Sequence, residues 1–156
     1  MSSMNRRQFV SGIAACACAT CPALQALAAA PDKTKAAPVD VGPVEEFQRP
    51  GLHDPAGSGR RFFLVNNRGR LYAVSSTCTH KKVSLVAAGD KLKCPRHGSG
   101  FDAEGRVTKS PARKPLPRYG IRLNEQGNVV VDTSTPFGER DWDAPESYLT
   151  LDNGRQ

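Results

Sequence analysis

Two cysteines and two histidines in two short motifs are the residues of this chain best suited to chemistry. Cys78 and His80 form the motif C-x-H, and Cys94 and His97 form the motif C-x-x-H. A glycine or proline close to each motif can turn the backbone around a metal ion. Thiolate and imidazole donors together suit zinc or iron–sulfur centres, and they argue against calcium or magnesium.

Two kinds of metal centre are compatible with these four donors. A tetrahedral zinc site needs four donors, but zinc fingers usually open with two cysteines and close with two histidines. Here each motif contains one cysteine and one histidine. This mixed arrangement suits a two-iron, two-sulfide cluster in which one iron binds both cysteines and the other binds both histidines. A chain that binds no metal is the third interpretation.

Three loops of the sequence resemble the Rieske iron–sulfur family. Residues 78–80 (CTH), followed by Leu85, resemble the first loop of that family, and residues 94–102 (CPRHGSGFD) resemble the second. Residues 110–112 (SPA) resemble the proline-containing third loop that covers the cluster. The resemblance covers roughly residues 39–133.

The resemblance implies a role for each matched residue. Cys78 and Cys94 would bind the inner iron of a [2Fe–2S] cluster, and His80 and His97 would bind the outer, solvent-facing iron. The residues that would surround the cluster without binding iron are Ser99, Leu85 and Pro111. Of these, Ser99 would supply a hydroxyl near the cluster.

Four positions differ from the high-potential members of the family. Those members have cysteines at positions 83 and 96 that bridge the two loops, whereas this chain has Val83 and Arg96, so no such disulfide is expected. Phe101 replaces a tyrosine that supplies a hydroxyl, and Lys82 replaces a common glycine. Because donors to the sulfurs stabilise the reduced cluster, we expect a midpoint in the lower half of the Rieske range of about −150 to +300 mV.

The first 28 residues resemble an export signal. Arg6 and Arg7 precede an uncharged stretch over residues 9–30, and the small-residue motif ALA ends at Ala28. We therefore expect a twin-arginine (Tat) signal peptide over residues 1–28 that directs the protein to the periplasm and is cleaved. The alternatives are an uncleaved anchor in the inner membrane, which would allow a membrane complex, and a lipoprotein modified at Cys16.

The distribution of cysteines agrees with a metal centre in an exported domain. Three of the five cysteines lie in the export segment, so only Cys78 and Cys94 remain downstream. No thiol is then left for a disulfide, and the loops must be held by the cluster and by packing. Export in the folded state, which the Tat route provides, would suit a cluster assembled before transport.

The rest of the chain is expected to form one domain with short extensions. A linker covers residues 29–38, the Rieske domain residues 39–133, and a C-terminal strap residues 134–156. The strap contains Trp142 and Tyr148, which we expect to pack on the domain, with a partner-docking surface as the alternative.

The domain is expected to be all-β. A hairpin signal at residues 66–69 and a turn at residues 125–127 separate β-rich runs, and residues 53–59 form a turn-rich loop. The β-rich runs are residues 39–41, 61–65, 71–74, 91–93, 100–102, 118–123 and 128–131. No segment has a helical period. We therefore expect an antiparallel β-sandwich with a small cluster-binding subdomain inserted through its loops.

The charge of the chain favours an acidic partner. The formal net charge is +7, and the loss of Arg6 and Arg7 with the signal would leave +5. The basic residues near the site are Lys81, Lys82, Lys91, Lys93, Arg96, Arg113 and Lys114. They could steer an acidic redox protein toward the site or could simply be solvated. Nucleic acid is not expected, because no basic groove interleaved with aromatic residues is present.

One-electron transfer is the expected function. Two neutral imidazoles in place of two thiolates make a cluster easier to reduce than a plant-type cluster. We expect a small exported carrier; the alternatives are a Rieske subunit of a quinol- or arsenite-oxidising membrane enzyme and a non-redox zinc module. A Rieske oxygenase is excluded, because its mononuclear iron needs two more histidines and only His53 remains.

Overall fold

The computed structural model describes residues 37–55 and 61–151. The predicted export signal and most of the predicted linker lie outside these residues. The strands of the large sheet are β1 (Val39–Pro43), β2 (Gly51–His53), β3 (Phe62–Asn67), β4 (Arg70–Ser75), β9 (Arg118–Leu123), β10 (Asn128–Phe137) and β11 (Leu149–Thr150). The strands of the small sheet are β5 (Val86–Ala88), β6 (Lys91–Lys93), β7 (Gly100–Asp102) and β8 (Val107–Lys109).

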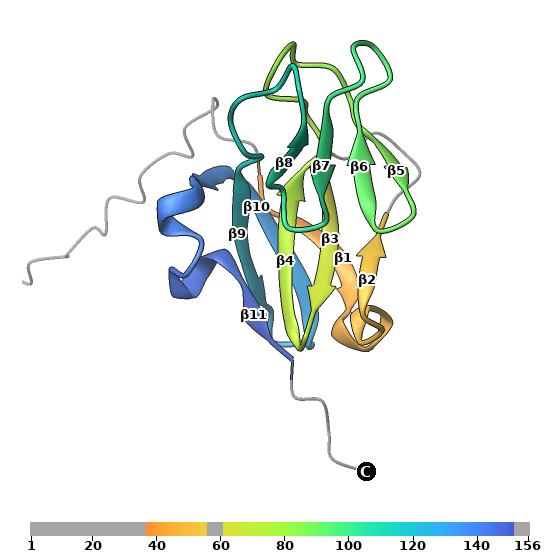
Figure 1. The fold of residues 1–156 in the computed structure, drawn as a ribbon. Helices are drawn as coiled ribbons and strands as arrows, with labels where there is room; N and C mark the ends of the chain where they lie inside the picture. The colour runs from red at the N-terminus through yellow and green to blue at the C-terminus, as the bar shows by residue number, and fades with distance from the viewer. Residues whose placement is uncertain (1–36, 56–60, 152–156) are drawn as a thin grey trace, which may run out of the picture. The chain divides into compact units, whose positions relative to one another are not determined.

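Both sheets are antiparallel. The large sheet has the order β1-β10-β9-β4-β3-β2, and β11 also pairs with β4. The small sheet has the order β5-β6-β7-β8, and it lies beside β3 and β4 (Figure 1). The described helices are single 3-10 turns, namely η1 (Val44–Phe47), η2 (Glu139–Asp141) and η3 (Pro145–Ser147). The all-β expectation is therefore confirmed.

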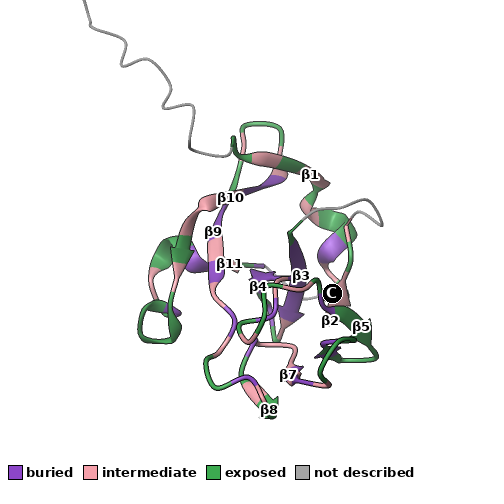
Figure 2. Cartoon of the chain, turned by 90° about the horizontal axis from the view of Figure 1, so that it is seen from above, coloured by how far each residue is buried: buried purple, intermediate pink, exposed green. Residues whose placement is uncertain are grey.

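The hairpin β3–β4 is the centre of the domain. Arg68 and Gly69 both have positive φ angles, 53° and 81°, as a two-residue turn between twisted strands requires. Successive residues of a strand point to opposite faces, yet Phe62–Val65 and Leu71–Ser75 are all buried, as the purple colour of β3 in Figure 2 indicates. Both faces of this hairpin are therefore covered.

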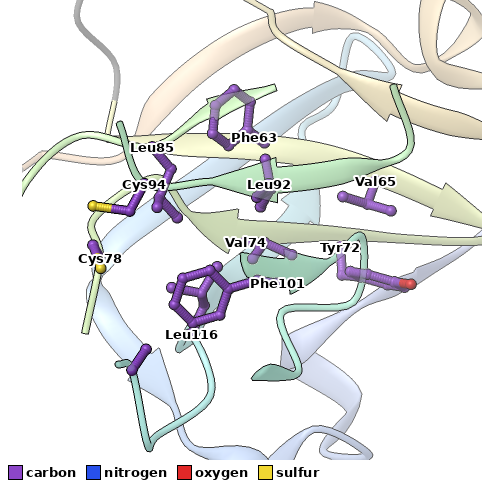
Figure 3. Close-up of a cluster of buried hydrophobic side chains, with 11 residues drawn as sticks. Phe63, Val65, Tyr72, Val74, Cys78, Leu85, Leu92, Cys94, Phe101 and Leu116 are labelled. Carbon is purple, nitrogen blue, oxygen red and sulfur yellow. The ribbon is translucent and has the colours of Figure 1, made fainter. Parts of the chain in front are cut away.

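Each face of the hairpin contributes to a separate buried cluster. The cluster that we call the sheet core lies on one face and contains Phe47, Phe62, Leu64, Leu71, Ala73, Ile121, Val129, Val131 and Leu151. The cluster that we call the site core lies on the other face and contains Phe63, Val65, Tyr72, Val74, Cys78, Leu85, Leu92, Cys94, Phe101, Ala112 and Leu116 (Figure 3). The site core joins the large sheet to the small one.

The residues after β10 pack back on the large sheet. Leu149 of β11 pairs with Leu71 of β4, Trp142 is buried, and the hydroxyl of Ser147 donates to the carbonyl of Trp142 at 2.6 Å. None of the helices within the described residues has the length and apolarity needed to cross a membrane.

Several short elements differ from the sequence-based expectation. His53 ends β2 rather than starting a loop, and β10 continues to Phe137 beyond the expected end at residue 131. The strands β5, β8 and β11 were not expected. Each has only two or three residues, which is too short for an alternating pattern to be recognised.

Candidate metal centre

Three loops gather beyond the same end of the small sheet (Figure 1). The first follows β4 and contains Cys78 and His80, the second joins β6 to β7 and contains Cys94 and His97, and the third joins β8 to β9. In an antiparallel sheet of short strands, the loops at one end are necessarily neighbours. The topology therefore brings together the two motifs, which are separated by 13 residues in the sequence.

Backbone hydrogen bonds fold each ligand loop on itself. In the first loop, the amide of Cys78 donates to the carbonyl of Val83 at 2.9 Å, and the amide of Leu85 donates to Ser76 at 2.7 Å. In the second, the amide of Cys94 donates to the carbonyl of Ser99 at 2.8 Å. The short second turn also requires a positive φ angle of 75° at Gly98, which glycine adopts without steric cost.

The two cysteines form one pair of donors. Cys78 and Cys94 are both free thiols and both buried, and their side chains lie within hydrogen-bonding contact of each other. Figure 3 shows both sulfurs at the same edge of the site core. Two thiols in this position can bind the same metal ion.

The two histidines form a second pair. The rings of His80 and His97 meet edge to face, with 5.1 Å between their centroids and an angle of 81° between their planes. His97 is exposed and His80 partly buried. The Nδ1 atom of His80 is buried and has no hydrogen-bond partner among the described residues. A buried imidazole nitrogen without a partner is the donor that a metal ion would satisfy.

The backbone of the second loop favours the thiolate form of Cys94. Burial raises the pKa of this thiol, but hydrogen bonds from the backbone N–H groups of His97 and Arg96, together with Cys78, outweigh it and lower the pKa overall. Since the thiolate is the form that binds metal, the loop favours the form of Cys94 that could coordinate a metal ion.

The third loop is linked to both ligand loops by hydroxyl groups. The fully buried Ser99 hydroxyl accepts a hydrogen bond from the amide of Ala112 at 3.1 Å. The hydroxyl of Thr79 donates to the carbonyl of Lys114 at 2.7 Å. Thr79 was not singled out from the sequence, although its position between two expected ligands was the available signal.

The other residues expected around the centre occupy different environments. Leu85 is buried in the site core, and Pro111 is partly buried after a cis peptide bond with Ser110. Phe101 is completely buried and belongs to the site core. Val83 packs against the site core, while Arg96 is exposed.

The donors therefore form two like pairs, one of thiols and one of imidazoles. Among the residues that the structure describes, no group of three or more His, Cys, Asp or Glu side chains is placed to hold a single metal ion. Two pairs fit a cluster of two metal ions that each take two protein ligands, with the buried thiols on the inner ion and the surface imidazoles on the outer one. The residues present therefore fit a [2Fe–2S] cluster.

The fold and this donor set define a small all-β domain with a mixed cysteine–histidine centre. The family model described as the Rieske [2Fe–2S] domain matches residues 37–120, more than half of the chain. The chain therefore belongs to the Rieske [2Fe–2S] domain family, and its cofactor is a [2Fe–2S] cluster.

Curated relatives carry the same domain in longer proteins. The chain is 33% identical over 91 residues to the cytochrome b6-f complex iron-sulfur subunit of Chlorobaculum tepidum, which covers 53% of this chain and 50% of that protein. It is 41% identical over 76 residues to the chloroplastic cytochrome b6-f complex iron-sulfur subunit of Volvox carteri. This match covers 46% of this chain and 37% of that protein. The chain thus spans half or less of the length of these relatives.

The chain is also similar to two solved structures. The plasma membrane Rieske protein PetC3 from Synechocystis PCC 6803 has a TM-score of 0.48 and 31% identity, and the match covers 61% of this chain and 99% of that one. The ferredoxin of carbazole 1,9a-dioxygenase from Nocardioides aromaticivorans IC177 has a TM-score of 0.42 and 24% identity, with coverage of 62% and 98%.

Proposed function

We propose that the protein transfers single electrons through a cluster held by Cys78, Cys94, His80 and His97. The observation that carries this proposal is the division of the donors into a buried thiol pair and a surface imidazole pair. When bound, the cluster accepts and releases one electron. The cysteines keep one side of the site away from water, and the histidines make the other side the exit to a partner.

The ligand assignment is tested by replacing one histidine that is expected to bind iron and one that is not. Replacing His97 by Ala should abolish the EPR signal of the reduced protein and its visible absorption, since the outer ion loses half of its protein ligands. The matched control is His53→Ala. His53 bonds through Nε2 to the carbonyl of Arg49 at 2.8 Å and packs against Phe47, so its removal should leave both signals unchanged. A full EPR signal in His97→Ala would falsify the assignment. A colourless protein that retains zinc would favour the zinc module.

A small carrier is favoured over a quinol-oxidising subunit by the groups that surround the thiols. Phe101 supplies no hydroxyl, and Val83 and Arg96 supply no disulfide, so fewer interactions stabilise the added electron. Exposed charge at Lys81, Lys82 and Arg96 favours reduction, but solvent screens it. We expect a midpoint in the lower half of the range of about −150 to +300 mV that changes little with pH near neutrality. Voltammetry across pH measures it, and a midpoint above about +200 mV at neutral pH would reverse this ranking.

The partner is expected to present an acidic face. The basic residues near the site are all exposed, namely Lys81, Lys82, Lys91, Lys93, Arg96, Arg113 and Lys114. Such a surface should accelerate encounters with anions, and the effect should weaken with salt. Stopped-flow oxidation by ferricyanide should therefore slow as ionic strength rises, and Lys82→Glu should slow it more than Arg122→Glu, an exposed change on β9. Equal effects of the two variants would contradict a docking face at the site.

Export by the Tat route to the periplasm remains part of the proposal. It rests on Arg6, Arg7 and the motif that ends at Ala28. Replacing both arginines by lysine should leave the protein in the cytoplasm, and the mass of the exported wild-type protein distinguishes cleavage after Ala28 from a retained anchor or a lipid at Cys16. Export of the lysine variant at the wild-type level would exclude this route.

A further inference from the structure

A second polar site lies where the hairpin, the small sheet and the C-terminal segment meet. It is a cavity of about 270 Å³. Its lining residues are Asn67, Arg70, Tyr72, Glu104, Arg106, Arg118, Glu139, Trp142 and Asp143. Figure 3 shows Tyr72 at the opposite end of the site core from Cys78 and Cys94. The cavity is therefore separate from the metal centre.

Three buried side chains around this cavity have unpaired polar atoms. The Arg118 Nε and the Trp142 Nε1 have no hydrogen-bond partner among the described residues, and the Tyr72 hydroxyl has none of good geometry there, although the Asn67 side chain lies close enough to lower its pKa. These three residues are only 2%, 6% and 5% exposed. A buried polar group without a partner costs stability, so three of them around one cavity indicate a missing partner.

The unpaired groups determine the chemistry of that partner. The indole N–H and the guanidinium N–H can only donate hydrogen bonds, and a tyrosine hydroxyl donates readily. A cation has no lone pair to offer these groups. The missing partner must therefore be a hydrogen-bond acceptor.

The cavity is lined by three arginines and by the carboxylates of Glu104, Glu139 and Asp143, so the case for a charged acceptor depends on the buried Arg118. Arg70 pairs with Asp143 at 3.4 Å, and Arg106 pairs with Glu104. Glu104 also accepts from the amide of Asn67 at 2.6 Å. It forms a long ion pair with Arg118 at 3.9 Å, and its carbonyl accepts from Arg118 at 3.4 Å. Arg118 is thus the buried arginine of the cavity, with a long ion pair and an unpaired Nε, and burial lowers its pKa to about 10.

The unpaired donors are held rigidly in place. The Arg118 guanidinium lies between two rings, 3.9 Å from the centroid of Tyr72 and 4.1 Å from that of Trp142. Arg106 covers Trp142 at 5.3 Å. Stacking of this kind fixes the plane of the guanidinium, and donors fixed in advance lose less entropy when they bind a ligand.

We propose that this cavity binds a small oxyanion, a phosphate or a small carboxylate, through Tyr72, Arg118 and Trp142. The volume is just below the range of about 300–1,000 Å³ that holds drug-sized ligands, so the ligand has few non-hydrogen atoms. The site is independent of the proposed electron transfer, and its test does not depend on redox activity.

The test uses the full-length iron-loaded protein and the fluorescence of Trp142, which is the only tryptophan of the chain. Inorganic phosphate and succinate are titrated at constant ionic strength, with chloride as the reference, and calorimetry checks the heat of binding. A saturable response to phosphate or to succinate is expected, and the stronger of the two identifies the class of oxyanion. A response no larger than that of chloride to either probe overturns the proposal and leaves only water in the cavity.

The variant Tyr72→Phe separates a ligand site from a structural role. It keeps the ring against Arg118 but removes the unpaired hydroxyl, so affinity should fall about tenfold or more, as expected for losing a hydrogen bond to a charged group. Without added oxyanion, its melting temperature should equal or exceed that of the wild type. Unchanged affinity, or a lower melting temperature in the absence of oxyanion, contradicts the proposal.

Two exposed arginines provide a matched pair of variants. Arg106→Gln removes a charge next to Trp142 and should weaken binding, whereas Arg122→Gln removes the same charge on β9, outside the cavity, and should leave it unchanged. Equal weakening by both variants would indicate a general effect of net charge and would also contradict the proposed site.

Discussion

The two faces of the hairpin β3–β4 are both buried, but they pack against different parts of the molecule. In the sheet core, Leu64 and Leu71 belong to the same cluster as Val129 and Val131, which lie in the same large sheet. In the site core, Phe63 and Val74 belong to the same cluster as Leu92 and Phe101 of the small sheet and the two cysteines. The sheet core contains no metal-binding side chain among its members, whereas the site core includes the thiols of Cys78 and Cys94. We therefore expect the first to be independent of iron and the second to depend on it.

Removal of iron should produce the largest difference between the two cores in their protection from hydrogen exchange. Metal binding can contribute much of the folding free energy of a small site, and no disulfide holds the ligand loops. Hydrogen exchange on the iron-free protein should show residues 78–100 losing protection while β3, β4, β9 and β10 stay protected. Equal protection of these loops with and without iron would mean that packing alone holds the site core.

A matched pair of core truncations should separate global from local stability. Leu64 in the sheet core and Leu92 in the site core are both completely buried, and truncation of a buried leucine costs about 2–5 kcal/mol. Leu64→Ala should lower the free energy of unfolding with or without iron. Leu92→Ala should act mainly by accelerating the loss of the cluster's visible absorption. Denaturant unfolding of the iron-loaded and iron-free proteins measures these free energies. Equal effects of the two variants on the iron-free protein would mean that the two cores do not differ in their dependence on iron.

The hydroxyl links to the third loop should differ in strength. Ser99→Ala leaves the buried amide of Ala112 without its acceptor, which should cost about 1–3 kcal/mol and lower the reduction potential. Thr79→Val breaks a comparable link to Lys114 at an exposed position, where water replaces the lost partner. Thermal unfolding and voltammetry of the iron-loaded variants compare them. If Thr79→Val proved as costly as Ser99→Ala, burial would not be the deciding factor.

Tyr72, at the end of the site core away from the cysteines, should make a smaller contribution to the free energy of unfolding, and this contribution should depend on pH. Burial raises the pKa of Tyr72 above its usual value near 10, and the Arg118 guanidinium opposes this shift only in part. Below pH 10 the Tyr72 hydroxyl is protonated in the folded protein and in the unfolded chain. As the pH rises above 10, the unfolded chain loses this proton first, so the free energy of unfolding falls. Arg118 has the opposite sign, since its pKa is lowered to about 10. Because the two groups also act on each other, the difference between wild type and Tyr72→Phe reports the tyrosine together with its effect on the pKa of Arg118.

Chemical denaturation at several pH values measures this difference. The two proteins should follow parallel curves from pH 7 to 9 and diverge from about pH 10, with the wild type losing more stability. Curves that stay parallel to pH 11 would show that Tyr72 ionises as easily in the folded protein as in the unfolded chain.

Sequence patterns predicted the parts of the molecule that depend on neighbours along the chain. The run at residues 118–123 coincides with β9, and the hairpin signal lies at the turn of Arg68 and Gly69, because turn residues and alternation act over a few positions. The strand β2 and the extension of β10 past Val131 were missed. Both depend on partners far away in the sequence, and β10 continues across an irregularity in its pairing with β9.

What the sequence by itself determined is the chemistry available at the site, because donor type and spacing within a loop are local properties. Cys78, His80, Cys94 and His97 could be named from two short motifs. Only the tertiary structure decided how these donors pair, since the sheets set which loop faces which and bring thiol to thiol and ring to ring. Likewise, no local pattern marked Arg118 as a buried cation. Its position between Tyr72 of β4 and Trp142 of the C-terminal segment arises only when strands distant in sequence pack together.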